Sequence, residues 1–198
     1  MRDPTATRSR VLDEALVSFA SQGYGVTSLD GLAHRLGLSK QTILHHFGTK
    51  EGVLEAVVDR SATELVAALE EALARAGPGF SRVEALVRAI FRLAARRPEL
   101  LGLLREVSRL GPPAATRLLG ALDPLVERAR AFLEVEMAEG RMRQHDPRLL
   151  LLSAYSTVIG VATEVEVLRA VGVDPTARSL VQRRAELLGF LRSALVVD

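Results

Sequence analysis

Two short amphipathic segments separated by one glycine constrain the fold of this 198-residue chain more than any other feature. Thr27 stands three residues before Asp30, a spacing typical of a capping box at a helix start. Gly37 suits the left-handed conformation that ends a helix, and Ser39 suits the N-cap of a second helix that is expected to end near Phe47. Two helices of this length with so short a connection predict a helix-turn-helix.

The remaining chain also has the pattern of helices. Apolar residues recur at helical spacing, while residues typical of strands are rare. Pro124 is expected to break or kink the helix that contains it. We expect an all-α protein of about nine helices, with a three-helix head over residues 1–51 and a helical bundle over residues 52–198. After the two short helices, the expected helices cover residues 50–75, 81–96, 99–109, 114–139, 147–171 and 177–196.

Composition narrows the class of protein further. The chain has no cysteine, which excludes disulfides and thiolate metal sites and fits a reducing compartment. Its most apolar stretch, residues 149–162, is too short and too polar to span a bilayer, and the first residues lack the apolar run of a signal peptide. These features predict a soluble, cytoplasmic protein that does not enter membranes.

The motifs of common enzymes are missing from the sequence. There is no Glu-x-x-His pair of a carboxylate metal site, no glycine-rich phosphate loop and no serine nucleophile elbow. We therefore expect no enzyme activity, no metal and no cofactor.

Positive charge is concentrated in the N-terminal quarter. Residues 1–50 hold six basic and four acidic residues, so they account for the whole net charge of +2. No acidic residue lies between Asp30 and Glu51. Because the excess is only two charges, composition alone leaves nucleic-acid binding and a chance fluctuation equally open.

The second short helix has one face for packing and one for contact. At about 100° per residue, Ile43 and Phe47 share the inner face, whereas Gln41 and His45 point away from it. An amide and an imidazole can read the hydrogen-bonding edges of bases in a major groove. The pattern therefore predicts that Gln41 and His45 read DNA sequence.

The segment from Gly25 to Glu51 resembles the DNA-binding head of the TetR family of bacterial one-component regulators. The resemblance is carried by Thr27-Ser28, by residues 33–39, by residues 42–47 and by Thr49-Lys50-Glu51. It implies a DNA-binding head followed by a bundle that binds an effector and dimerises. The sequence departs from the family at Leu44, where a tyrosine usually contacts phosphate, so Leu44 is expected to lie against the sugar backbone or a thymine methyl group.

Phosphate contacts are expected beside the base-reading positions. Thr27, Thr42 and Lys50 are the main candidates, and Lys50 also opens a helix whose N-terminal amides favour an anion. Arg8 and Arg10 are either phosphate contacts or an ordinary solvated helix start. The full set predicted to contact DNA is Thr27, Ser39, Lys40, Gln41, Thr42, Leu44, His45 and Lys50.

Two of these interpretations have alternatives. His45 and His46 could bind a metal, but adjacent helical residues diverge and no third ligand follows at a suitable spacing. Gln41 could be a solvated surface residue. His46 is expected to pack near the inner face.

The bundle has two expected roles, dimerisation and effector binding. The helices at 147–171 and 177–196 are the expected homodimer interface, the alternative being that they close the core of one chain. The resemblance implies a repressor that binds a pseudo-palindromic operator on double-stranded DNA and is released by a small effector; a transcriptional activator or a ligand-independent DNA binder is the alternative. An apolar or amphipathic effector is expected to contact Phe91, Leu103, Leu104, Phe132, Met137 and Tyr155.

Overall fold

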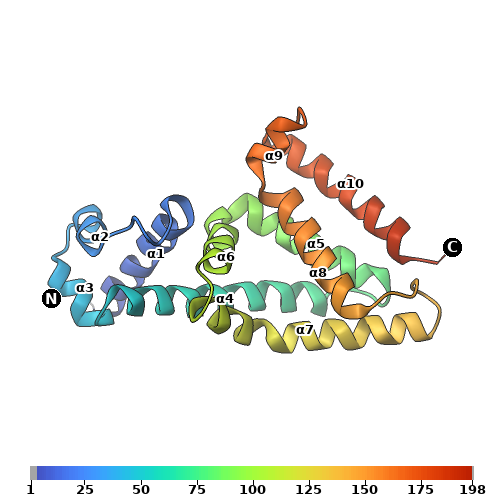
Figure 1. Ribbon diagram of the computed structural model, residues 1–198, viewed down its shortest axis with the longest axis horizontal. Coiled ribbons are helices and arrows are strands. Elements are labelled where there is room, and N and C mark those ends of the chain that lie inside the picture. Colours follow the sequence, from blue (N-terminus) through green and yellow to red (C-terminus); the bar gives the residue numbers. More distant parts are fainter. Residues whose placement is uncertain (1–3, 198) are drawn as a thin grey trace. The chain divides into compact units, whose positions relative to one another are not determined.

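A computed structural model describes residues 4–197 (Figure 1). Residues 1–3 and 198, the outer ends of the two predicted domains, lie outside this part. The described residues form ten helices, so the all-α prediction is confirmed. The helices are α1 (Pro4–Gln22), α2 (Leu29–Leu36), α3 (Lys40–Phe47), α4 (Lys50–Ala74), α5 (Phe80–Arg96), α6 (Pro98–Leu110), α7 (Ala114–Ala138), α8 (Pro147–Thr163), α9 (Val165–Ala170) and α10 (Ala177–Leu195).

Two helices differ from the sequence-based prediction. The helix expected over 147–171 is two helices, α8 and α9, because the backbone breaks at Glu164 (φ −81°, ψ 79°). In a continuous helix the Val161 carbonyl would accept a bond from residue 165; here the Arg183 guanidinium of α10 donates to it. Conversely, α7 continues through Pro124, so the expected break is absent.

The chain divides into two compact units. The first comprises Met1–Leu65 and Glu99–Ala121, and therefore unites α1 to α3 with the first part of α4, most of α6 and the start of α7. The second comprises Val66–Pro98 and Leu122–Asp198. The domain boundary predicted between residues 51 and 52 lies within α4, inside the first unit.

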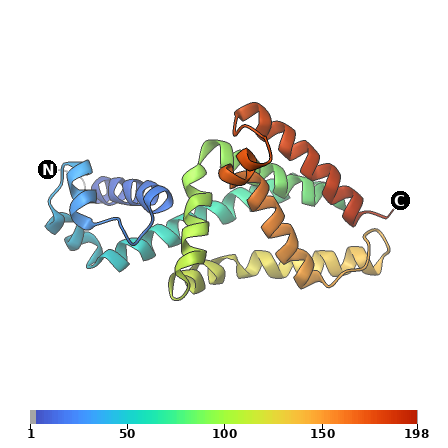
Figure 2. The same cartoon turned by 45° about the horizontal axis from the view of Figure 1, so that its top comes forward.

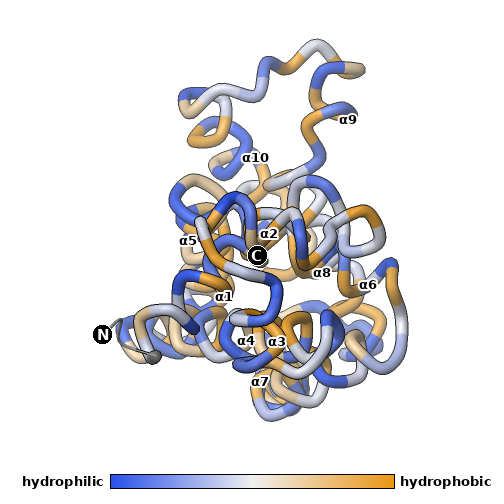
Figure 3. The backbone as a smooth tube through the Cα atoms, turned by 90° about the vertical axis from the view of Figure 1, so that its left-hand side faces the viewer, coloured by the Kyte–Doolittle hydropathy of each residue, from blue (hydrophilic) through white to orange (hydrophobic). Residues whose placement is uncertain are grey.

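The three-helix head has its own apolar core, because α1 and α2 each bury a stripe of residues and α3 buries Ile43. Along the backbone, apolar and polar positions alternate within the helices (Figure 3). The fully or almost fully buried residues of this core are Val11, Leu12, Ala15, Leu16 and Phe19 of α1, Leu32 and Ala33 of α2, and Ile43 of α3.

The turn of the helix-turn-helix has the caps that its residues favour. Gly37 adopts the left-handed conformation (φ 62°), and the Ser39 hydroxyl accepts the Thr42 amide as N-cap of α3. The N-cap of α2 is Ser28, which accepts the Gly31 amide, and not Thr27 as the capping-box pattern predicted.

In the second unit α5, α8 and α10 pack against one another (Figures 1 and 2). Their buried core contains Phe80, Val87, Phe91, Val158, Ala162, Leu187, Leu188, Leu191 and Leu195. A smaller cluster contains Leu133, Met137 and Met142.

Candidate nucleic-acid interface

Helix α3 presents one polar face to solvent. Ile43 is completely buried and is the anchor of the helix, whereas Gln41 and His45 are exposed. Thr42 and Leu44 lie half-buried on the flanks. An α-helix with this division can enter a major groove with its outer side chains against the base edges.

Two hydroxyl groups lie together at the N-terminus of α3. The Ser39 and Thr42 oxygens are 2.9 Å apart, and Ser39 Oγ also accepts the Thr42 amide at 3.1 Å. Each hydroxyl has one proton to donate. Their mutual bond uses one of these protons, so the other remains available for a phosphate oxygen.

Lys40 is paired within the head. Its Nζ lies 2.9 Å from Asp30 Oδ2 of α2, and both side chains are largely exposed. Exposed ion pairs contribute little stability and are screened by salt. A phosphate could therefore compete with Asp30 for this ammonium group at small cost.

Thr27 occupies a different position from that of the other predicted phosphate contacts. Its side chain is buried, and its hydroxyl donates to the Gly23 carbonyl at 2.8 Å. A phosphate oxygen is only an acceptor, so it would have to displace that internal bond. The neighbouring Ser28 is exposed, and its hydroxyl proton is not used by the cap it provides.

Lys50 folds back onto the connector between α1 and α2. Its Nζ lies 4.2 Å from the centre of the Tyr24 ring and donates to the Gly25 carbonyl at 3.3 Å. The Tyr24 hydroxyl donates to Glu51 Oε1 at 3.0 Å. Burial, together with the Glu51 carboxylate, raises the pKa of Tyr24 to about 12, so the phenol stays protonated at neutral pH.

The role of Tyr24 was not predicted from the sequence, which indicated only a connector there. The signal available was an aromatic residue between two glycines, Gly23 and Gly25, directly before the helix-turn-helix.

The two arginines of α1 lie against the head. The Arg8 guanidinium carbon is 5.2 Å from the centre of the Phe47 ring, and Arg10 Nη2 donates to the Leu36 carbonyl at 3.0 Å. Both arginines are exposed, so they add positive charge beside α2 and α3.

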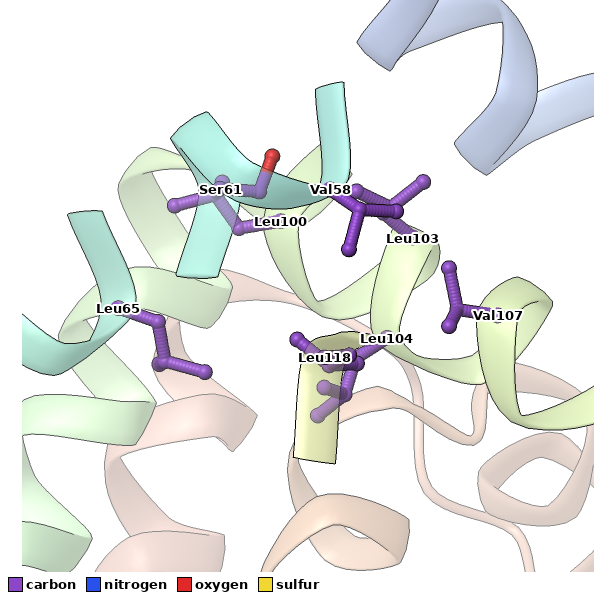
Figure 4. Close-up of a pocket in the computed structure, with 8 residues that line it drawn as sticks. All are labelled: Val58, Ser61, Leu65, Leu100, Leu103, Leu104, Val107 and Leu118. Atoms are coloured by element: carbon purple, nitrogen blue, oxygen red, sulfur yellow. The ribbon is translucent and has the colours of Figure 1, made fainter. Parts of the chain in front are cut away.

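The six predicted effector contacts are divided between the two units. Leu103 and Leu104 line a void of about 10 Å³ with aliphatic residues of α4, α6 and α7 and Ser61 (Figure 4). A void of this size holds about one water molecule. Phe91 lies in the core of the second unit, Phe132 and Met137 belong to its smaller cluster, and Tyr155 is exposed on α8.

An apolar face remains exposed on α8 and α10, although both helices also bury residues in the core of the second unit. Large apolar patches on a protein surface often mark a site that binds a partner. The exposed residues, called here the α8/α10 face, are Leu149, Leu152 and Tyr155 of α8 with Phe190 of α10; Val181 is also exposed but, nine residues before Phe190, lies on the opposite side of α10.

A metal site and a membrane-spanning helix are two further possibilities for a chain of this composition. Across residues 4–197, no three His, Asp or Glu side chains are placed to hold a metal ion; the His45 and His46 rings contact each other edge-on, with centres 5.6 Å apart. Among the helices of the same residues, none combines the length and apolar character needed to cross a bilayer.

Known proteins resemble both the head and the whole chain. A family model described as bacterial regulatory proteins of the tetR family matches residues 11–57. PfmR, a TetR-family transcriptional regulator of Thermus thermophilus, is 30% identical over 78% of this chain and 84% of PfmR, with a TM-score of 0.67. The chain belongs to the TetR family.

Further relatives of this TetR-family regulator are known. The transcriptional activator FasR of Mycolicibacterium smegmatis is 32% identical over 84 residues, which are 42% of this chain and 38% of FasR. The chain spans less than two fifths of the length of the curated relatives it matches. A regulator from Saccharomonospora viridis, solved with choline, shares the fold over 98% of this chain and 100% of that one, with a TM-score of 0.79 and 20% identity.

Proposed function

We propose that this TetR-family transcriptional regulator is a repressor in the bacterial cytoplasm, at the nucleoid. It binds a pseudo-palindromic operator as a homodimer and is released by a small apolar or amphipathic effector. The observation that carries the DNA-binding part is α3, in which Gln41 and His45 stand exposed on a helix anchored by the buried Ile43.

The proposed base contacts come from Gln41 and His45. An amide can form two hydrogen bonds to adenine, and an imidazole can donate to or accept from a base edge. Leu44, on the flank of the same helix, is proposed to lie against the sugar backbone or a thymine methyl group.

The proposed phosphate contacts surround α3. Ser39 and Thr42 together have one hydroxyl proton free to donate to a phosphate oxygen. Lys40 reaches phosphate by leaving its exposed ion pair with Asp30. Lys50 reaches phosphate by leaving the Gly25 carbonyl. Thr27 is proposed to contact phosphate from its position just before α2. Its hydroxyl would first have to leave the Gly23 carbonyl, to which it donates. These contacts position the head without reading sequence.

The proposed dimer forms through the α8/α10 face. A two-fold axis there brings identical apolar residues of two copies together. Two heads then reach half-sites about 34–36 Å apart, which gives a selectivity that one short helix cannot provide.

The effector is proposed to contact Leu103 and Leu104, where the first unit has its apolar void. Phe91, Phe132, Met137 and Tyr155 stay candidates in the second unit. The ligand releases the protein from DNA if it binds more tightly to a dimer whose two heads are wrongly spaced for the operator than to one whose heads fit it.

The test of DNA reading compares an operator with a random duplex. Genome-wide mapping of bound sites supplies the operator, and fluorescence anisotropy measures both affinities at several salt concentrations. We expect Gln41→Ala and His45→Ala each to lose about 1–3 kcal/mol of discrimination, and Lys50→Ala to weaken both duplexes alike. Gln22→Ala and His34→Ala, at exposed positions outside α3, are the matched controls. Equal losses on both duplexes for Gln41→Ala and His45→Ala would contradict the assignment.

Activation is the second candidate, because FasR is a transcriptional activator. A promoter fusion, measured with and without the protein, distinguishes the two: expression falls for a repressor and rises for an activator.

A further inference from the structure

Helix α6 has two faces with different neighbours. Leu100, Leu103, Leu104 and Val107 line the aliphatic void with side chains of α4 and α7 (Figure 4). At about 100° per residue, Gly102 and Glu106 lie on the opposite side of the helix. These two residues, one helical turn apart, contact the end of α1 and the connector that follows it.

The first contact is a close approach of backbones at Gly102. A Cβ atom there would lie 3.0 Å from Ala20 Cβ and 3.3 Å from the Ala20 carbonyl oxygen of α1. Both distances are shorter than nine in ten real Cβ contacts, so any side chain at position 102 would require α1 or α6 to shift by a few tenths of an ångström.

The second contact is a buried carboxylate. Glu106 is only 9% exposed, and its Oε1 accepts the Tyr24 amide at 2.7 Å. Arg109 donates to both carboxylate oxygens, at 2.8 and 3.0 Å. Gly23 lies directly beside this carboxylate, since a Cβ there would be 3.4 Å from Oε1.

Tyr24 connects this carboxylate to the proposed DNA contacts. Its amide is held by Glu106, its ring lies under the Lys50 ammonium group, and its hydroxyl donates to Glu51. Lys50 and Glu51 open α4, directly after α3. A continuous set of contacts therefore runs from α6 to Lys50.

We propose that Glu106 is a positioning residue for DNA binding: by holding the Tyr24 backbone it fixes the α1–α2 connector, and through the Tyr24 ring it sets where the Lys50 ammonium group lies. This inference rests on the proposed DNA-binding function. It gives α6, which follows the head in sequence, a direct part in operator affinity.

The chain contains a matched control for a merely structural role. Glu136 is also buried, at 5% exposure, and also accepts two bonds from one arginine, Arg141, both at 2.8 Å. It lies in the second unit, however, and Arg141 belongs to that same unit. Glu106→Gln and Glu136→Gln therefore remove equivalent buried charges, of which only one faces Tyr24.

The experiment measures two quantities on the full chain carrying each substitution. Hydrogen exchange followed by NMR reports the protection of the Tyr24 amide, and fluorescence anisotropy reports affinity for the mapped operator. We expect Glu106→Gln to speed exchange at Tyr24 and to weaken operator binding, each by about tenfold, because a bond to a charged acceptor is lost. Glu136→Gln should leave both quantities within about twofold of the wild type.

A double variant separates positioning from lost stability. If Glu106 acts through Lys50, Lys50→Ala with Glu106→Gln should bind no more weakly than the weaker single variant. Fully additive losses, unchanged Tyr24 exchange in Glu106→Gln, or equal effects of Glu136→Gln would each overturn the inference. Failure of the wild type to bind any operator would instead refute the proposed function, while the exchange measurement would still test the Glu106–Tyr24 contact.

Discussion

Phe190 is the most informative residue with which to test the proposed dimer. It lies on α10, within the α8/α10 face, and 62% of its surface is exposed in one chain. The ring points away from the core that α10 forms with α5 and α8. Replacing it with aspartate should therefore leave the folded chain intact and prevent two copies from associating.

The size of the effect follows from the exposed area. A phenylalanine buries about 200 Å², so the exposed part of Phe190 corresponds to roughly 120 Å², or about 3 kcal/mol of transfer free energy. A two-fold interface contains the residue twice, which gives about 6 kcal/mol when both rings are fully covered. The dissociation constant should then rise by about four orders of magnitude.

Sedimentation velocity at micromolar concentration measures this change, because it distinguishes the mass of one chain, 21.4 kDa, from that of a dimer. We expect twice that mass for the wild type and the single-chain mass for Phe190→Asp. Leu119→Asp is the matched control, since Leu119 is 64% exposed on α7, outside the α8/α10 face. The reasoning fails if Phe190→Asp sediments as the wild type does, or if both variants dissociate alike.

Three further results are expected. Ser61→Ala should raise the free energy of unfolding in urea by about 1 kcal/mol, because the buried Ser61 hydroxyl has no hydrogen-bond partner among the described residues; a decrease would indicate a bound water instead. Leu44→Tyr should tighten operator binding about fivefold through a new phosphate bond, as measured by anisotropy, whereas Leu44→Phe should not. Bonds from Arg109 hold the pKa of Glu106 below its ordinary value of 4.5, so its stabilising contribution is complete above that pH and disappears as the pH falls through the lowered value. Glu106→Gln should consequently flatten the acid limb of a plot of stability against pH, and an unchanged limb would show that the carboxylate adds nothing.

The local pattern of the sequence was sufficient for most of the helices and for the faces of α3. Helical periodicity alone separates Ile43 from Gln41 and His45, because the sides of a helix follow from the spacing of its residues. The sequence does not decide the cap of α2, since Thr27 and Ser28 both have a hydroxyl that can accept an amide. In the structure Ser28 is the cap, and the Thr27 hydroxyl donates to the Gly23 carbonyl instead, a contact that the spacing of residues does not predict.

Contacts between distant residues could not be read from the sequence. At the break between α8 and α9, the Val161 carbonyl accepts a hydrogen bond from Arg183, which lies 22 residues further along the chain. Tyr24 and Glu106 are 82 positions apart. Neither pair has a periodic signal, because each depends on how whole helices pack. The six effector candidates stay a prediction for the same reason: apolar spacing predicts which residues are buried but not which helices meet.

The anchoring of α3 has a consequence for how operator preference can change. Ile43 is the one residue of this helix that is buried outright, and the residues on its outer face take no part in the core. Substitutions at positions 41 and 45 are therefore nearly free of a penalty in folding. New operators can be acquired by exchanging those side chains while the scaffold stays constant, so this head is a suitable starting point for engineered regulators with altered targets.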